Sequence, residues 1–175
     1  MGHPLFYWHP SLLHNQGDGT FKDASKTAGL DPPPGGPFSD LIINGKPATR
    51  SQRAAATIDF DGDGRLDLVV SQFNDKALLY RNVSRPGRWI GLRLAATRTN
   101  RAAIGAVVKV TAGGRTQVRQ VQAAGGYLSQ STNDLHFGLG SATAVERVEI
   151  RWPGGQVQVI EKPKIDARTT ITEPR

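Results

Sequence analysis

The half of the chain after residue 88 is built from short segments in which apolar and polar residues alternate. Seven segments have this pattern, at residues 89–95, 104–111, 115–122, 135–139, 145–152, 156–160 and 169–172. Paired glycines, Gly113-Gly114 and Gly154-Gly155, separate such segments and permit the positive φ angles of tight hairpin turns. Several short strands joined by turns are typical of two packed sheets. The sequence therefore predicts a β-sandwich over residues 88–173.

Composition favours an all-β fold and excludes several kinds of site. The 175 residues include 20 glycines and 11 prolines, more turn-forming residues than long helices tolerate. Cysteine is absent, which excludes disulfides, thiol nucleophiles and thiolate metal ligands. No apolar run approaches the roughly 20 residues of a membrane span, and the first residues lack the charged and apolar regions of a signal peptide.

The chain before residue 85 has fewer strand-like segments. Residues 12–23 contain two short stretches around Asp18-Gly19, which predicts a β-hairpin. Farther along, apolar residues predict a buried strand over 66–70, with 77–80 as its hairpin partner. Because turn residues follow at 85–87, we expect two domains, residues 1–85 and 88–173.

An acidic loop, residues 59–67, precedes the predicted strand. Its sequence DFDGDGRLD places Asp59, Asp61, Asp63 and Asp67 at positions 1, 3, 5 and 9, and the carbonyl group of Arg65 at position 7. Calcium takes roughly six to eight oxygen ligands, and alternating carboxylates let a short chain wrap around such an ion. The spacing therefore predicts a calcium site formed by these five residues.

The same loop bears on the location of the protein. Position 12 is Val70 where an EF-hand has a bidentate glutamate, which excludes a helix–loop–helix site. Extracellular calcium modules bind the ion with a Kd of roughly 10⁻⁴ to 10⁻³ M, which suits millimolar calcium outside the cytoplasm. We therefore expect an extracytoplasmic protein, either periplasmic, on the cell surface or secreted.

Two parts of the chain resemble known modules. Residues 59–80, with NQGDGTF from Asn15, resemble the FG-GAP/VCBS-type repeats of calcium-binding β-propellers. Residues 89–160 resemble the ASPIC/UnbV domain, through the stretches NRAAIGAVVKVTAGG, GYLSQS, LHFGLG and VEIRWPGG. The resemblance implies a partial propeller-like segment followed by a sandwich, with an adhesion, matrix or assembly role outside the cytoplasm and no established reaction.

The chain departs from a complete propeller. Propellers close with roughly four to eight blades, and this chain holds at most about one and a half repeats. The copy at residues 15–23 lacks the series of carboxylates, so we do not expect a second calcium ion there. Either the chain is the tail of a longer propeller protein, or a partner covers its open strand edges.

Charge is divided unevenly between the two halves. Residues 1–80 hold 7 Lys/Arg and 9 Asp/Glu, a net charge of −2, and residues 81–175 hold 15 and 6, a net charge of +9. The basic half predicts a solvated surface or one that faces an acidic protein, glycan or lipid headgroup. Nucleic acid is a weaker alternative, because no recognition motif accompanies the scattered cations.

The sequence contains no complete catalytic constellation. Ser129, Asp134 and His136 lack the Gly-x-Ser-x-Gly elbow of a hydrolase. Glu146 and Glu149 lie three residues apart on one predicted strand and point to opposite faces, unlike a glycosidase pair. We therefore expect no enzymatic activity.

These observations predict a calcium-stabilised protein-interaction or scaffolding module, a non-catalytic subunit or the C-terminal part of a larger assembly. The alternative is a carbohydrate-binding or carbohydrate-processing surface protein, in which Trp89, Trp152 or Tyr127 stacks on sugar rings.

Overall fold

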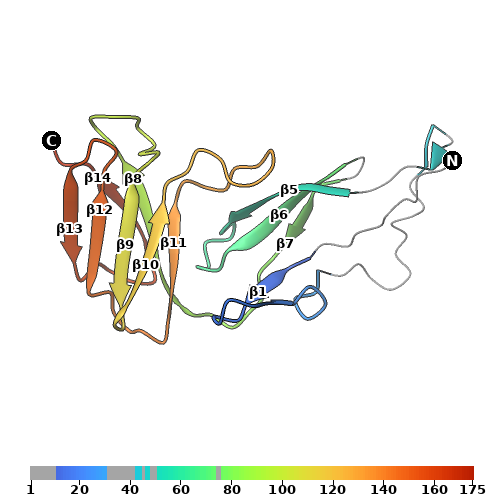
Figure 1. Ribbon diagram of the computed structural model, residues 1–175, viewed down its shortest axis with the longest axis horizontal. Coiled ribbons are helices and arrows are strands. Elements are labelled where there is room, and N and C mark those ends of the chain that lie inside the picture. The colour runs from blue at the N-terminus through green and yellow to red at the C-terminus, as the bar shows by residue number, and fades with distance from the viewer. Residues whose placement is uncertain (1–10, 31–41, 45, 48–50, 74–75) are drawn as a thin grey trace. The chain divides into compact units, whose positions relative to one another are not determined.

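The computed structural model describes residues 11–30, 42–44, 46–47, 51–73 and 76–175, and these residues form an all-β protein (Figure 1). No helix in this described part is long and apolar enough to cross a membrane. Residues 1–55 and 69–80 form one compact unit, and residues 56–68 and 81–175 form a second.

The first unit contains short antiparallel pairs. Strands β1 (Leu13–Asn15) and β2 (Phe21–Asp23) form the predicted hairpin, with His14 opposite Lys22. Gly19 has a φ angle of 89°, which explains the need for glycine in this turn. Strands β3 (Ile42–Ile43) and β4 (Lys46–Pro47) form another two-stranded sheet.

Strands β5 (Ser51–Ile58), β6 (Asp67–Phe73) and β7 (Leu78–Tyr80) form a three-stranded sheet in that order. The predicted pairing of a strand at 66–70 with 77–80 is therefore confirmed. The acidic loop connects β5 to β6. Its two ends are therefore held by strands that are neighbours in this sheet. A propeller-like arrangement of these strands stays a prediction.

The second unit contains the sandwich. One sheet has four strands in the order β10-β9-β12-β13, and the other has three in the order β11-β8-β14. Their bounds are β8 Arg88–Ala95, β9 Val107–Ala112, β10 Arg115–Gln120, β11 Leu135–Gly140, β12 Arg147–Arg151, β13 Val157–Glu161 and β14 Arg168–Thr172. All seven predicted strands are present, with ends shifted by a few residues.

The core lies between the two sheets. Ile90 and Leu92 on β8 and Phe137 on β11 are fully buried, as are Val108 on β9 and Val148 on β12. The polar residues that follow Leu92 on β8 and Val108 on β9 are exposed, as the period-2 pattern of the sequence predicts. Burying a large apolar side chain contributes roughly 1.5–3 kcal/mol, so this shared core holds the sheets together.

Strand β8 is the central strand of the three-stranded sheet. It pairs antiparallel with β11, where Phe137 lies opposite Ile90, and parallel with β14, where Thr169 lies opposite Leu92. The first and last strands of the sandwich are therefore neighbours.

We expect Phe137→Ala to lower the free energy of unfolding by about 3–5 kcal/mol, because it leaves a cavity between the sheets. Val118→Ala, at a residue that is 58% exposed on β10, should change it by less than about 0.5 kcal/mol. Urea unfolding followed by tryptophan fluorescence measures both. Equal effects of the two substitutions would contradict the assignment of the core.

Candidate metal centre

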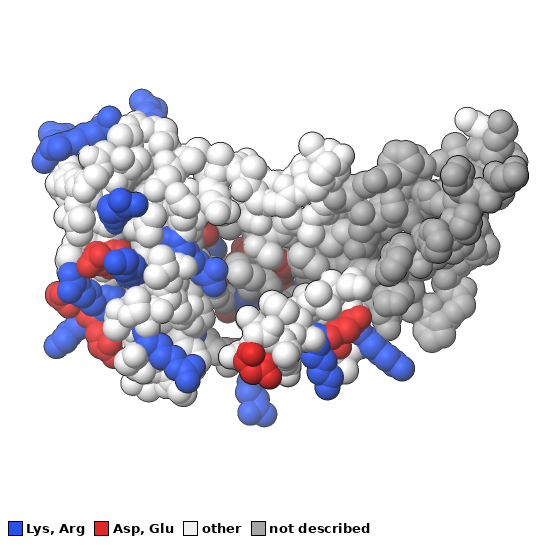
Figure 2. Space-filling model, viewed as in Figure 1, with Lys and Arg blue, Asp and Glu red and all other residues white. Residues whose placement is uncertain are grey.

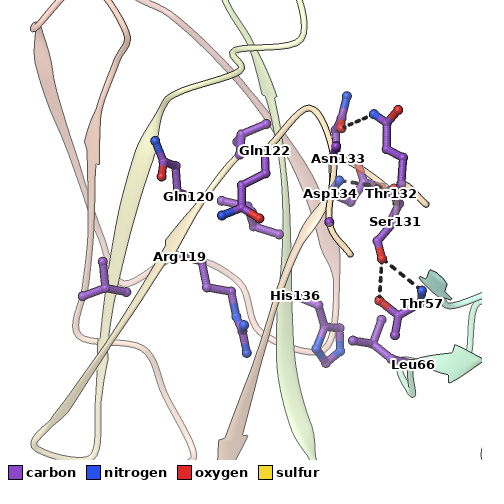
Figure 3. A pocket seen from close by; sticks show the side chains of 16 residues that line it. Thr57, Leu66, Arg119, Gln120, Gln122, Ser131, Thr132, Asn133, Asp134 and His136 are labelled. Carbon is purple, nitrogen blue, oxygen red and sulfur yellow. Dashed lines mark hydrogen bonds between the residues drawn. The ribbon is translucent and has the colours of Figure 1, made fainter. Parts of the chain in front are cut away.

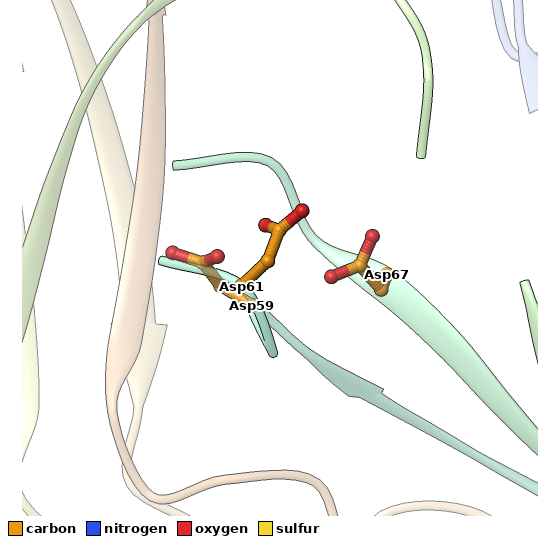
Figure 4. Close-up of side chains that lie close together, drawn as sticks. All are labelled: Asp59, Asp61 and Asp67. Carbon is orange, nitrogen blue, oxygen red and sulfur yellow. The ribbon is translucent and has the colours of Figure 1, made fainter. Parts of the chain in front are cut away.

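Three carboxylates converge where β5 ends and β6 begins (Figure 4). Asp59 follows β5, Asp61 lies in the loop and Asp67 is the first residue of β6. One oxygen from each lies within 4.8 Å of the others. Asp59 and Asp67 are buried, whereas Asp61 is exposed. The structure thus brings together three of the four carboxylates that the sequence predicts as calcium ligands.

Backbone amides hold the two buried carboxylates. Asp67 accepts hydrogen bonds from the amides of Phe60 (3.0 Å) and Asn82 (2.7 Å), and Asp59 Oδ2 accepts one from Gly64 (3.1 Å). Asp59 Oδ1 is buried and has no hydrogen-bond partner among the residues that the structure describes. A buried carboxylate oxygen without a partner is costly. A cation among the three side chains would supply that partner, so the residues present fit a metal ion.

Asp63 and Arg65 bind each other in the structure. Asp63 Oδ1 accepts from the Arg65 amide at 2.9 Å, and its Oδ2 accepts from the Arg65 guanidinium. These hydrogen bonds hold the pKa of Asp63 below its ordinary value. Its carboxylate is not part of the converging group. Ligation by Asp63 and by the Arg65 carbonyl stays a prediction.

Arginines from outside the loop also face the acidic group. Arg81 Nη2 lies 2.8 Å from Asp61 Oδ2, and Arg168 Nη2 lies 3.5 Å from Asp59 Oδ2. Arg168 Nε is also 3.3 Å from Asp134, which Arg93 binds through both carboxylate oxygens. Sequence reasoning did not predict these partners, because no local pattern joins positions so far apart in the chain.

The acidic loop is attached to the sandwich through Gly64. His136 Nε2 hydrogen bonds to the Gly64 carbonyl at 2.8 Å, and the imidazole ring stacks on Trp89 with a centroid distance of 5.4 Å. Nearby, the amide of Thr57 donates to Ser131 Oγ at 3.1 Å. These contacts explain why residues 56–68 belong to the same compact unit as the sandwich. The division into domains at residues 1–85 and 88–173 stays a prediction.

The residues considered for a catalytic triad have separate partners. Ser129 Oγ donates to the carbonyl of Gly125, Asp134 binds Arg93, and His136 binds the loop as described. The absence of enzymatic activity stays a prediction.

Two of the three aromatic residues considered for sugar stacking are engaged within the protein. Trp152 is 1% exposed and donates from Nε1 to Gln158 at 3.0 Å, so its ring is part of the core. Trp89 is half-buried against His136. Tyr127, in contrast, is 68% exposed.

The fold and the site define an all-β protein in which an acidic loop is anchored to a β-sandwich. Residues 96–175 match the family model described as ASPIC and UnbV, which confirms that part of the resemblance. The FG-GAP/VCBS repeat stays a prediction.

The chain is similar to cartilage acidic protein 1 from several vertebrates. It is 35% identical to the Homo sapiens protein over 77 residues, covering 44% of this chain and 9% of that protein. It is 32% identical to the Xenopus tropicalis protein over 129 residues, covering 69% of this chain and 20% of that protein. The match therefore spans a fifth or less of these curated relatives.

We expect Gly64→Ala to destabilise the loop strongly. A Cβ atom there would lie 2.0 Å from Trp89 Nε1, and the φ angle of +85° disfavours any L side chain. Gly62→Ala is the matched control, because φ is +76° and a Cβ meets nothing within 4 Å. The control should cost about 1–2 kcal/mol of unfolding free energy and Gly64→Ala clearly more. Denaturant unfolding compares them, and equal costs would contradict the packing of Gly64 against Trp89.

Proposed function

We propose that this protein is a calcium-stabilised, extracytoplasmic interaction or scaffolding module, acting as a non-catalytic subunit or the C-terminal part of a larger assembly. The observation that carries the proposal is the buried Asp59 oxygen, which lacks a partner in the described part of the chain and belongs to a group of three converging carboxylates. The ASPIC/UnbV match and the similarity to a protein named for cartilage support a role outside the cytoplasm.

Asp59, Asp61 and Asp67 would hold the ion, with Asp63 and the Arg65 carbonyl as further ligands. The ion would supply positive charge to a loop whose carboxylates otherwise repel one another. Because the ligands belong to the end of β5, the loop and the start of β6, binding would stabilise this connection and its attachment to the sandwich. The proposed role of calcium is structural.

The proposed partner is an acidic protein surface. Residues 81–175 carry a net charge of +9, and Figure 2 shows lysines and arginines spread over the sandwich. Strand β13 is an edge of the four-stranded sheet, and its Val157 and Val159 are 55% and 41% exposed. An open edge with apolar side chains can pair with a strand of another protein.

Calcium should raise the thermal unfolding midpoint of the wild-type protein relative to a chelator. At ten times Kd, the ion would stabilise the fold by about 1.4 kcal/mol. Asp59→Asn should abolish this increment, because it removes the charge from a carboxylate whose side chain is only 2% exposed. Scanning calorimetry with calcium or a chelator measures the increment, and isothermal titration calorimetry measures binding directly.

Asp166→Asn is the control, because Asp166 is a carboxylate outside the acidic loop that pairs with Arg88. It should keep the calcium increment. Asp61→Asn should also reduce the calcium increment. Because Asp61 is exposed, this substitution should leave the fold intact. If wild-type protein gains no stability and binds no calcium at millimolar concentration, the calcium part of the proposal fails.

Val159→Asp should weaken binding of an acidic partner while changing the unfolding free energy by less than about 0.5 kcal/mol, because the side chain is exposed on an edge strand. The measurement is affinity capture from the extracytoplasmic fraction of the source. It compares the amount of partner that the wild-type protein and the variant retain. Val118→Asp, on the opposite edge strand β10, is the control. Unchanged capture by Val159→Asp would exclude β13 as the docking edge.

A further inference from the structure

A cavity of about 390 Å³ lies between β10 and the connection from β10 to β11 (Figure 3). Thr57 and Leu66, near the two ends of the acidic loop, also line it. Arg119 and Gln122 line one side, Ser131 and Leu66 line the other, and His136 lies between them. Its volume falls within the range of roughly 300–1,000 Å³ that is usual for small-molecule sites. None of the carboxylates predicted as calcium ligands lines it.

The walls of the cavity are rich in neutral groups that both donate and accept hydrogen bonds. Such side chains are Gln120, Gln122, Gln130, Asn133, Thr57, Ser131 and Thr132. Primary amides carry two donors and an acceptor, and hydroxyl groups serve as either. Sugar hydroxyls have the same dual character, so they can be matched by a wall of this kind. The Gln122 side chain has no hydrogen-bond partner among the described residues, which leaves it available to a ligand.

The cavity also presents one uncompensated positive charge. Asp134 is the carboxylate that lines it, and Arg93 and Arg168 already neutralise this group. Arg119 pairs with no carboxylate in the described part of the chain, and its guanidinium lies 5.5 Å from the centroid of the Phe137 ring. Stacking on an aromatic ring holds the guanidinium in place while leaving its N–H groups able to bind an anion.

We propose that this cavity binds one anionic sugar residue of an acidic glycan. Arg119 binds the carboxylate or sulfate group of the sugar, and the side-chain amides and hydroxyls, with Gln122 foremost, bind its hydroxyl groups. This site goes beyond the proposed scaffolding role and does not depend on partner binding at β13. It gives the basic half of the chain a specific anionic ligand.

The test uses the full chain with calcium present and three tetrasaccharides. A hyaluronan fragment carries carboxylates without sulfate, a heparin fragment carries sulfates as well, and maltotetraose is neutral. Isothermal titration calorimetry should show binding of at least one charged fragment and weaker or no binding of maltotetraose. Preference for the hyaluronan fragment assigns the carboxylate to Arg119, and preference for heparin assigns the sulfate.

Arg119→Gln should weaken binding of the preferred fragment about tenfold to a hundredfold, the loss expected for a hydrogen bond between charged groups. Arg115→Gln is the matched control, because Arg115 lies on the same exposed strand outside the cavity, and it should change affinity by less than about twofold. Gln122→Ala should weaken binding without changing the net charge.

Circular dichroism and unfolding midpoints verify that these exposed substitutions leave the fold intact. Equal losses for Arg119→Gln and Arg115→Gln would overturn the proposal, because they would show diffuse attraction to the basic surface. The proposal would also be overturned if the two single variants, Gln122→Ala and Arg119→Gln, both kept full affinity. It would likewise be overturned if the wild-type protein bound none of the fragments at millimolar concentration.

Discussion

The contact of Gly64 with Trp89 and His136 determines how the acidic loop is held. Gly64 donates its amide to Asp59, accepts from His136 through its carbonyl group, and leaves no room for a side chain beside the Trp89 indole. Because a carbonyl oxygen only accepts, the His136 imidazole carries its proton on Nε2 in this contact. One residue without a side chain therefore links a buried carboxylate to strands β8 and β11 of the sandwich.

The acidic loop also illustrates how a protein distributes like charges. Asp63 is neutralised locally by Arg65, two residues away, whereas Asp59 and Asp61 face arginines from distant parts of the chain. Exposed pairs of this kind contribute little stability, typically below about 1 kcal/mol. The ion pair between Arg168 and Asp59 differs from these exposed pairs, because the Asp59 side chain is only 2% exposed to solvent. That carboxylate also carries the buried oxygen that has no hydrogen-bond partner among the described residues.

The sequence contained most of the information about the sandwich and part of that about the site. Strands such as β8 and β9 were predictable because alternation and paired glycines are local signals. The convergence of Asp59, Asp61 and Asp67 was predictable for the same reason. The link between His136 and Gly64 was not, because it joins residues 72 positions apart, and Arg168 lies 109 positions from Asp59. Attachment of the loop to the sandwich thus depends on long-range contacts that no local pattern encodes.

The parallel pairing of β14 with β8 has a consequence for the order of folding. Strand β8 begins at Arg88 and β14 ends at Thr172, so the sheet that contains both must bring together distant parts of the chain. Closing such a loop is entropically costly and slows the search for native structure. During synthesis, β8 leaves the ribosome long before β14 does. The backbone edge of β8 that pairs with β14 therefore stays without its hydrogen-bond partners until β14 has been made. The nascent sandwich is therefore most exposed to misassociation in the interval before its final residues emerge.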